Sequence, residues 1–359
     1  MQYELRGIGK TLPDEVHIHP LDLVLDPSSF NVLLGPIRSG KTTLLRLLAG
    51  LDRPSQGQLL ADDGDITNQR LGSRRVAMVY QEFINYPNLS VHGNIASPLR
   101  RRLSKGEACA RAAEFAALVH IEHLLDRRPH ELSGGQQQRL AIARALACDA
   151  DLLLLDEPLV NLDLKLREEL REELTEILGS SRATVVYATS EPQEALILGG
   201  RVALLHEGRL IQQDQTLQAY HRPASALAGQ LFSDPPMNQW PVHLNGDRAD
   251  LAGNFTCFLQ AVPVDSNGSY LVGLRANHVH LRQRREDWIP LPIVVDMAEI
   301  NGSETFIHGR HEGLRIIVQE DGAHHHAVGS RITCYLDPTR LLWFDEQGER
   351  LLRAYREAA

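Results

Sequence analysis

Cysteine is scarce in this sequence, and long apolar runs are missing. The chain has 359 residues and four cysteines, Cys109, Cys148, Cys257 and Cys334, none of them in a CxxC pair. This pattern suggests neither a disulfide framework nor a zinc site, and it favours a reducing compartment. No run approaches the roughly 18 apolar residues that a membrane helix needs, and the start lacks the apolar core of a signal peptide. We therefore expect a soluble, cytoplasmic protein that reaches a membrane only through a partner.

The sequence also lacks an excess of basic residues. Its 37 Lys and Arg are outnumbered by 46 Asp and Glu, which gives a net charge of -9. This balance argues against a nucleic-acid binder, since such proteins usually carry a basic face. We interpret the local basic clusters at 100–102 and 282–285 as solvated surface. The apolar share of 43% is that of a core-forming globular protein, and the length fits two domains.

Strands alternate with helices through the first two thirds of the chain. Apolar runs at 31–35, 151–156 and 183–189 are typical of buried strands. The predicted helices cover residues 42–49, 104–125, 133–147, 164–178 and 191–198. This order predicts an α/β fold with a mainly parallel sheet. Beyond residue 235 short β-type segments alternate with Gly, Asn and Asp turns, which predicts a small all-β domain of barrel or sandwich type.

Residues 35–42 read Gly-Pro-Ile-Arg-Ser-Gly-Lys-Thr and match the phosphate-loop pattern G-x-x-x-x-G-K-S/T. The glycines let backbone N–H groups curl around phosphates, and the helix that opens at Lys41 adds its positive dipole end. Lys41 would reach the β- and γ-phosphates of ATP, and the Thr42 hydroxyl would ligate Mg²⁺. The predicted ATP-binding residues of this loop are Gly35, Pro36, Ile37, Arg38, Ser39, Gly40, Lys41, Thr42 and Thr43.

Two carboxylates stand where the apolar run at 151–156 ends. Asp156 can hold Mg²⁺ beside the phosphate loop, and Glu157 can orient or polarise the attacking water. The alternative is that both residues merely cap the strand in a polar turn. A phosphate loop in the same chain favours the catalytic interpretation.

A second glycine-bearing segment opens the predicted helix at 133–147. It consists of Leu132, Ser133, Gly134, Gly135 and Gln136. In isolation it is a flexible helix start, but its hydroxyl, its glycine N–H groups and the helix dipole can bind a phosphate. The segment resembles the signature of ABC ATPases. In that family two subunits pack head to tail, and each ATP lies between the phosphate loop of one subunit and the signature of the other.

Further residues follow the order of this family. Gln81 matches the glutamine that touches Mg²⁺ and the attacking water and that links the site to the membrane partner. Asn161 and Asp163 match the loop that crosses the dimer interface. Residues 83–95 resemble the contact region of sugar importers, although ordinary packing would use the same apolar residues.

The C-terminal part resembles the family too. Residues 272–279 and 342–349 resemble the C-terminal domain of maltose- and glycerol-phosphate-type importer ATPases. The resemblance implies a P-loop ABC-type nucleotide-binding domain over 1–234, with a helical subdomain at about 84–150, and an OB- or TOBE-like β domain over 235–359 that carries regulatory or dimer contacts.

The implied function is that of an ATPase that powers import of a carbohydrate, glycerol or polyol-type solute, with ATP and Mg²⁺. The implied partners are a second ATPase subunit, two transmembrane permease subunits and a solute-binding protein, with no nucleic acid. The implied location is the cytoplasmic face of the inner or plasma membrane, reached through the permease.

Two positions depart from the family pattern. Ser190 stands where the family has a histidine that contacts the γ-phosphate, and Leu12 stands where an aromatic ring stacks on adenine. Serine donates a hydrogen bond but cannot become cationic, and loss of one transition-state donor typically costs roughly 10²–10³ in rate. Base stacking is worth about 1–3 kcal/mol in single-strand binders, of which leucine recovers only part.

These departures lead to two hypotheses about assembly. In an asymmetric dimer a related but distinct ATPase carries the histidine, and the site built on Lys41 and Glu157 is slow. In a homodimer Ser190 works adequately. A different class of function is a nucleotide-gated regulatory half with negligible hydrolysis. A soluble ABC protein of DNA repair or translation would need a coiled-coil insertion or a second ATPase module, and neither appears in the sequence.

Overall fold

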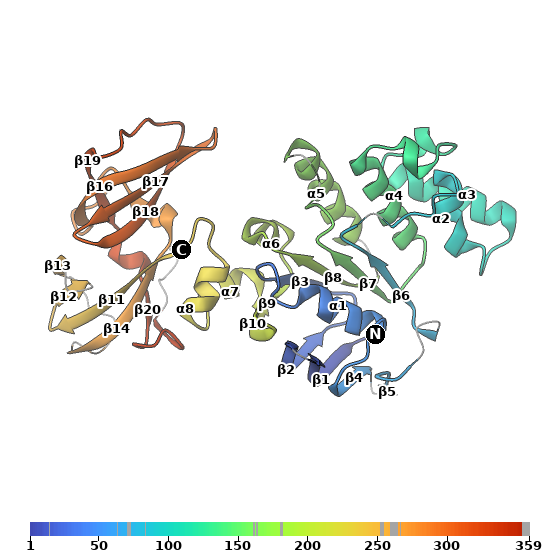
Figure 1. Ribbon diagram of the computed structural model, residues 1–359, viewed down its shortest axis with the longest axis horizontal. Coiled ribbons are helices and arrows are strands. Elements are labelled where there is room, and N and C mark those ends of the chain that lie inside the picture. The colour runs from blue at the N-terminus through green and yellow to red at the C-terminus, as the bar shows by residue number, and fades with distance from the viewer. Residues whose placement is uncertain are drawn as a thin grey trace. The chain divides into compact units, whose positions relative to one another are not determined.

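The computed structural model divides the chain into two compact units, residues 1–216 and 217–359 (Figure 1). It describes residues 1–13, 15–62, 64–69, 73–82, 84–160, 162, 164–179, 182–251, 255–258, 265 and 267–353. Among the described helices, none combines the length and the apolar character that a membrane-spanning helix requires. Each unit has its own hydrophobic core.

Two sheets form the framework of the first unit (Figure 1). The antiparallel sheet has the strand order β2-β1-β4-β5, and the mixed sheet has the order β10-β9-β3-β8-β7-β6. Their strands are β1 (Tyr3–Leu12), β2 (Glu15–Leu25), β3 (Phe30–Leu34), β4 (Gln56–Ala61), β5 (Gly64–Asp65), β6 (Val76–Val79), β7 (Leu152–Asp156), β8 (Thr184–Thr189), β9 (Arg201–His206) and β10 (Arg209–Gln215). As the apolar runs predict, β3, β7 and β8 are parallel neighbours, and β10 joins β9 in antiparallel fashion.

Helix α1 (Lys41–Ala49) ties these two sheets together. It contacts β2 of the antiparallel sheet and β6, β7 and β8 of the mixed sheet. Leu44 and Leu45 are fully buried in the same core as Leu5 of β1 and Leu154 of β7. Burying one such leucine contributes about 1.5–3 kcal/mol. The start of α1, and with it the phosphate loop, is therefore held at a fixed place above β3.

The remaining helices of the first unit are α2 (Val91–Leu99), α3 (Lys105–Leu118), α4 (Gly134–Leu146), α5 (Leu164–Gly179) and α6 (Pro192–Leu198). Helices α2, α3 and α4 contact one another, and short 3₁₀ turns at Glu122–Leu124 and Pro129–Glu131 connect α3 to α4. The helix predicted over 104–125 ends at Leu118. It stops there because His120 adopts a left-handed conformation, with φ 57°, and the Ile121 N–H bonds back to the Ala116 carbonyl.

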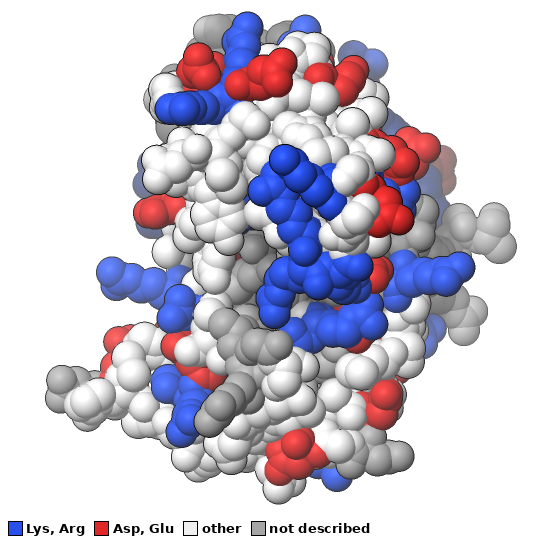
Figure 2. Space-filling view, turned by 90° about the vertical axis from the view of Figure 1, so that its right-hand side faces the viewer, with Lys and Arg blue, Asp and Glu red and all other residues white. Residues whose placement is uncertain are grey.

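Basic side chains gather on the end of the first unit that carries α2 and α3 (Figure 2). Arg100, Arg101 and Arg102 are all exposed. Arg102 and Arg75 share Asp149 as an ion-pair partner, at 3.0 and 3.2 Å. Exposed pairs of this kind contribute at most about 1 kcal/mol, so this surface adds little to the stability of the fold.

The second unit is built from antiparallel strands, in the two orders β13-β12-β11-β14-β20-β21 and β15-β19-β16-β17-β18 (Figure 1). The strands are β11 (Asn238–Asn245), β12 (Arg248–Leu251), β13 (Phe255–Phe258), β14 (Asn267–Leu274), β15 (Val279–His280), β16 (Ile289–Ile300), β17 (Glu304–His311), β18 (Leu314–Asp321), β19 (Arg331–Leu336), β20 (Leu342–Phe344) and β21 (Leu351–Arg353). The predicted all-β C-terminal domain is thus confirmed. Alternating burial along β11 and β16 shows why these segments form strands with one face in a core.

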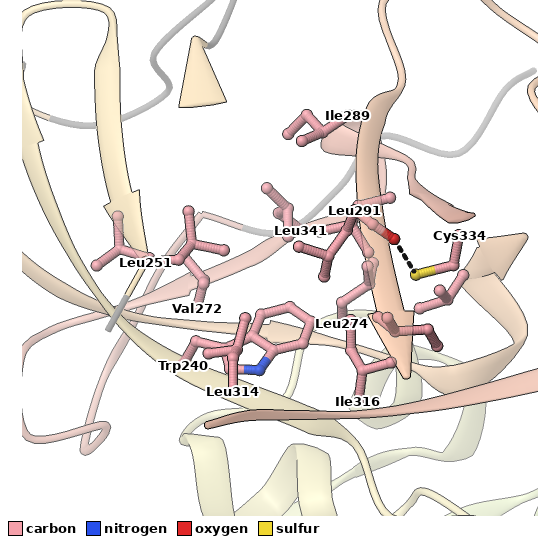
Figure 3. Close-up of a cluster of buried hydrophobic side chains, with 14 of the residues drawn as sticks. Trp240, Leu251, Val272, Leu274, Ile289, Leu291, Leu314, Ile316, Cys334 and Leu341 are labelled. Atoms are coloured by element: carbon pink, nitrogen blue, oxygen red, sulfur yellow. Dashed lines mark hydrogen bonds between the residues drawn. The ribbon is translucent and has the colours of Figure 1, made fainter. Parts of the chain in front are cut away.

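Both sheets of the second unit contribute to its core. Figure 3 shows Leu274 near Leu291 and Ile316 on one side of the Trp240 ring, and Val272 near Leu251 on the other. Polar atoms inside this core are bonded. The Trp240 Nε1–H donates to the Arg315 carbonyl at 3.0 Å, and the Cys334 thiol donates to the Leu291 carbonyl at 3.3 Å. Burial raises the pKa of the Cys334 thiol to about 12, so this cysteine packs as a small apolar residue.

Two short helices, α7 (Thr216–His221) and α8 (Ala226–Leu231), precede β11. The division between the compact units therefore falls earlier than residues 234–235, where the sequence changes character. The physical reason is that Ala226 of α8 is buried together with Met237 and Phe344 of the second unit. The change in the sequence near residue 235 marks where strands replace helices, whereas the boundary between the compact units depends on which residues pack together.

Candidate active site

An open cleft of about 790 Å³ lies in the first unit. The segments that line it follow the carboxyl ends of three adjacent parallel strands: the phosphate loop follows β3, Glu157 follows β7 and Ser190 follows β8. Ligands of open α/β sheets bind at this edge. Gln81, just beyond β6, lines the same cleft. The structure thus brings together Lys41, Thr42, Gln81, Glu157 and Ser190, which the sequence spreads over 150 positions.

The phosphate loop is a tight turn that ends in the amino terminus of α1. The Ser39 N–H donates to the Pro36 carbonyl at 3.1 Å, and Gly40 caps the helix with φ 101°. A Cβ atom on Gly40 would lie 2.5 Å from Ile18 Cδ1 and 3.1 Å from the His17 carbonyl oxygen. Only glycine fits at this position. The tight turn that it permits leads directly into the first turn of α1, whose N–H groups can bind an anion.

Lys41 is buried and makes three polar contacts at once. Its Nζ donates to the Gly35 carbonyl at 2.7 Å and to the Pro36 carbonyl at 3.0 Å, and it lies 3.1 Å from Glu157 Oε1. The ammonium group is thus fully directed to oxygen atoms along the cleft. Phosphate oxygens are stronger partners than neutral carbonyls because they carry charge.

Asp156 and Thr42 form the second polar contact of the site. The Thr42 hydroxyl donates to Asp156 Oδ1 at 3.1 Å. Burial raises the pKa of the Asp156 carboxyl above its ordinary value, and the Thr42 hydrogen bond only partly offsets this. A buried carboxylate beside a hydroxyl is a pair of hard oxygen ligands with negative charge left to neutralise, which suits Mg²⁺. The predicted metal ligands Thr42 and Asp156 therefore fit the ion.

Strained backbone gathers at this cleft. Eight non-glycine residues among those described have positive φ, and three of them line the cleft: Arg38 at 67°, Glu157 at 43° and Glu207 at 46°. Such conformations are uncommon for residues other than Gly, Asn and Asp, and they cluster at functional sites. Glu207, with Gly208 beside it, was not predicted as a site residue. It reaches the cleft through the β9–β10 turn.

A buried acid fixes the turn that carries Ser190. Thr189 Oγ1 accepts the Glu191 N–H at 3.0 Å and donates to Glu194 Oε2 at 2.6 Å. The hydroxyl of Tyr187 also donates to Glu194, at 3.4 Å. Burial raises the pKa of the Glu194 carboxyl and, well above its ordinary value, that of Tyr187. Sequence reasoning missed this network, because nothing in the sequence shows that Glu194 points inward.

Leu12, the predicted adenine contact, lies at the β1–β2 hairpin. It ends β1, pairs with Glu15 across the hairpin and is 41% exposed, and it is not among the residues that line the cleft. The hairpin register instead brings Glu15, Val16 and His17 of β2 to the cleft wall. Counting along the sequence could not fix this register, because the β1–β2 pairing contains several bulges. The predicted interface residues Asn161 and Asp163 lie outside the described residues.

The signature segment lies apart from the cleft of its own chain. Leu132 is buried, and Ser133 caps α4, accepting the Gln136 N–H at 3.4 Å while its own N–H donates to Gln136 Oε1 at 3.0 Å. Gly134 and Gly135 form the first turn of α4. None of these residues lines the cleft at the phosphate loop. The chain thus has two helix amino termini that could bind phosphate, at α1 and at α4, and the second does not line the cleft of the first.

The segment after Gln81 is fastened to the signature helix α4. The Asn85 side chain donates to the Gln137 carbonyl at 2.9 Å, and the Arg144 guanidinium donates to the Ile84 carbonyl at 2.5 Å. The same guanidinium lies 4.8 Å from the centre of the Tyr86 ring. A displacement of residues 84–86 would therefore be passed to α4.

Two protein families match this chain. The family described as "ABC transporter" matches residues 18–160, and the family described as "TOBE domain" matches residues 272–344. The sn-glycerol-3-phosphate import ATP-binding protein UgpC of Pectobacterium atrosepticum is 34% identical over 349 residues, which cover 96% of this chain and 97% of the relative. The protein of the same name from Salmonella choleraesuis is 35% identical and covers 97% and 99%.

A solved structure agrees. The ATP-binding cassette MJ0796, described as a dimer in a post-hydrolysis state bound to ADP and Pi, is 28% identical with a TM-score of 0.55. The match covers 60% of this chain and 98% of that chain. The nucleotide-binding fold inferred from the phosphate loop and the signature is thus confirmed. The chain belongs to the family of ATP-binding subunits of ABC importers of the carbohydrate and polyol type, which join an ABC nucleotide-binding fold to a TOBE domain and hydrolyse ATP to power transport.

Proposed function

We propose that this chain binds and hydrolyses ATP in the cleft above β3, β7 and β8, as one half of a head-to-tail dimer that powers import of a glycerol-phosphate, polyol or sugar-type solute. The observation that carries the proposal is the convergence of Lys41, Thr42, Glu157 and Ser190 on one cleft, with a signature segment placed elsewhere. The relatives named above import sn-glycerol-3-phosphate, which makes that solute the first to test.

The contacts of Lys41 and Glu157 suggest the order of events. Lys41 exchanges Glu157 for the β- and γ-phosphate oxygens when ATP enters, since charged oxygens are the stronger partners. The carboxylate of Glu157 is then free to orient the attacking water and accept its proton. Ser190 and Gln81 line the cleft beside it, where their polar groups can hold the water and the terminal phosphate.

Mg²⁺ completes the proposed site. Thr42, Asp156 and Gln81 are the residues that would hold it, and it would supply positive charge beside the phosphate oxygens. Asp156 needs such charge because burial raises the pKa of its carboxyl. The remaining donors come from the chain itself, through the N–H groups of the turn that ends at Gly40.

Two further sites of action follow from the geometry. Ser133 and the amino terminus of α4 would bind the ATP held by the opposite subunit. Ile84 and Tyr86, which are 50% and 51% exposed, would contact the permease subunits, and their attachment to α4 through Arg144 would couple transport to the nucleotide. The ATPase would then lie at the cytoplasmic face of the membrane, with two permease subunits and a solute-binding protein as partners.

Ser190 raises a second possibility for the dimer. A serine hydroxyl can donate to the γ-phosphate but brings no positive charge, so the site of this chain would be the slower one if a related ATPase with a histidine were its partner. In that arrangement Ser133 to Gln136 would serve the fast site of the partner. With a second copy of this chain as partner, both sites would be alike.

Dimerisation in the presence of ATP tests the proposal. Glu157→Gln protein should bind ATP without consuming it, and we expect a dimer of this chain by light scattering with ATP and a monomer with ADP. Adding Ser133→Ala should abolish the dimer but leave ATP binding intact. A protein that stays monomeric with ATP, and that dimerises only with a second ATPase subunit of its importer, supports the asymmetric arrangement. Absence of ATP binding would reject the proposed function.

A further inference from the structure

In the phosphate loop, Arg38 occupies a position whose backbone conformation favours glycine. The Pro36 carbonyl accepts the Ser39 N–H at 3.1 Å, so Pro36 to Ser39 form a β-turn in which Arg38 is the third residue. Its φ of 67° belongs to the left-handed region. As in a type II turn, this position favours glycine, and any side chain with a Cβ is disfavoured there.

The cleft that Arg38 lines carries little positive charge. Among the described residues that line the cleft, two are Lys or Arg, namely Lys41 and Arg38. Three glutamates line it too: Glu15, Glu157 and Glu207. Lys41 is engaged by Glu157 and two carbonyls. Because a nucleotide triphosphate brings several negative charges into this cleft, a second cation has a clear electrostatic role.

Ser190 defines what that cation has to supply. Ser190 lines the same cleft beyond the end of β8, and Glu157 lines it beyond the end of the neighbouring strand β7. A serine offers a hydrogen bond but no charge to a terminal phosphate. A guanidinium offers both, in a fork that matches phosphate oxygens and stays charged at all working pH values. Its side chain is also long enough to reach across a turn, which Ser190 cannot do.

We propose that Arg38 binds the terminal phosphate of ATP and supplies in the same subunit the positive charge that Ser190 lacks. The inference rests on the proposed function, since it requires ATP in this cleft. The strained backbone of Arg38 is then explained: a residue that costs stability in the turn is kept because it contributes to nucleotide binding. Glu157 and Glu207, the other residues with positive φ in this cleft, line it too.

Binding of fluorescent ATP and ADP analogues to the full-length chain tests this. Arg38→Met keeps a long side chain and the backbone strain but removes the charge. We expect it to weaken ATP binding roughly tenfold to a hundredfold, the range of a hydrogen bond to a charged group, and to leave ADP binding within about twofold. Arg38→Lys keeps the charge without the fork and should fall between the two. Arg38→Gly should match Arg38→Met in ATP binding while melting about 2 °C higher, because it relieves the strain.

Control variants separate this inference from the proposed function. Lys41→Ala should lose both nucleotides, and wild-type protein that binds neither would reject the proposed function itself. Wild-type ATP affinity in Arg38→Met, or equal losses of ATP and ADP affinity, would overturn the role of Arg38 at the terminal phosphate while leaving the site intact. Adding Ser190→His to Arg38→Met should restore much of the ATP preference, and no recovery would contradict the compensation between the two positions.

Discussion

The ammonium group of Lys41 lies 3.1 Å from the carboxylate of Glu157, so the proposed phosphate ligand and the proposed water-activating base hold each other. Their side chains are only 5% and 12% exposed, and an ion pair in such surroundings is screened little by water. Nucleotide phosphates have to replace this pair. In the proposed mechanism, binding of ATP would therefore also release the base.

Removing the charge of Glu157 separates these two roles. Glu157→Gln keeps an oxygen for Lys41 but cannot accept a proton from water, so we expect the rate of ATP hydrolysis to fall by about 10²–10⁴. ATP affinity should stay the same or rise, because the phosphates no longer compete with a carboxylate for Lys41. Phosphate release and analogue binding measure the two effects. Glu168→Gln, on the exposed side of α5, is the control, and comparable hydrolysis in both variants would argue against the role of Glu157.

Asp156 should trade stability for function. Burial raises the pKa of its carboxyl above the ordinary value of 3.8, so the folded chain binds this proton more tightly than the unfolded chain. The contribution of the protonated Asp156 carboxyl to the free energy of unfolding is then complete below pH 3.8 and is lost as the pH rises through the raised pKa. Asp156→Asn removes the ionisation and keeps an acceptor for Thr42. We expect a gain on the order of 1 kcal/mol in the free energy of unfolding at pH 7, together with loss of Mg²⁺-dependent hydrolysis.

Urea unfolding between pH 4 and pH 8 measures this trade. The difference between the Asn variant and the wild type should shrink as the pH falls toward 4, because a growing share of the Asp156 carboxyls is then protonated and neutral. A variant that is less stable than the wild type at pH 7 would show that Lys41 and Arg46 already compensate the buried carboxylate.

Arg144 should affect coupling rather than nucleotide binding. It connects Ile84 and Tyr86 to α4, outside the ATP cleft. In proteoliposomes with the permease and the solute-binding protein, Arg144→Met should reduce solute-stimulated hydrolysis by about 2- to 30-fold, the range of coupling energies of 0.5–2 kcal/mol. Its ATP affinity should not change. Arg111→Met, which removes a similar guanidinium from the Phe115 ring on α3, is the matched control. Equal stimulation in the two variants would contradict a coupling role.

The sequence predicts the position of those residues whose local structure depends on adjacent residues in the chain. The phosphate loop needs a strand before it and a helix after it, and both surround Gly40 and Lys41 in the structure. The run that ends at Asp156 is buried throughout, as a strand covered on both faces must be. Ser133 caps its helix because Ser and Gln at this spacing form a capping box.

Residues that reach the site through tertiary pairing could not be predicted. Glu207 arrives through the β9–β10 turn, and Glu194 becomes buried only because α6 packs against β3 and β8. Glu15, Val16 and His17 reach the cleft through the β1–β2 hairpin, whose bulges shift the register by residues that no sequence pattern reveals. Local rules fix the phosphate chemistry, whereas register and packing decide which other side chains surround it.

Two glycines offer the sharpest test of the loop geometry. Gly40→Ala would force a Cβ to within 2.5 Å of Ile18 Cδ1 at a φ of 101°, so we expect a loss of about 2 kcal/mol or more in the free energy of unfolding and loss of ATP binding. Gly106 is the second residue of α3, and its Cβ would meet nothing within 4 Å. Gly106→Ala should therefore stabilise the chain by about 0.5–1 kcal/mol and leave ATP binding unchanged. Denaturant unfolding and analogue binding, measured on both variants, decide the matter. If Gly40→Ala is as stable as Gly106→Ala and still binds ATP, the tight approach of the loop to β2 is not what shapes the phosphate site.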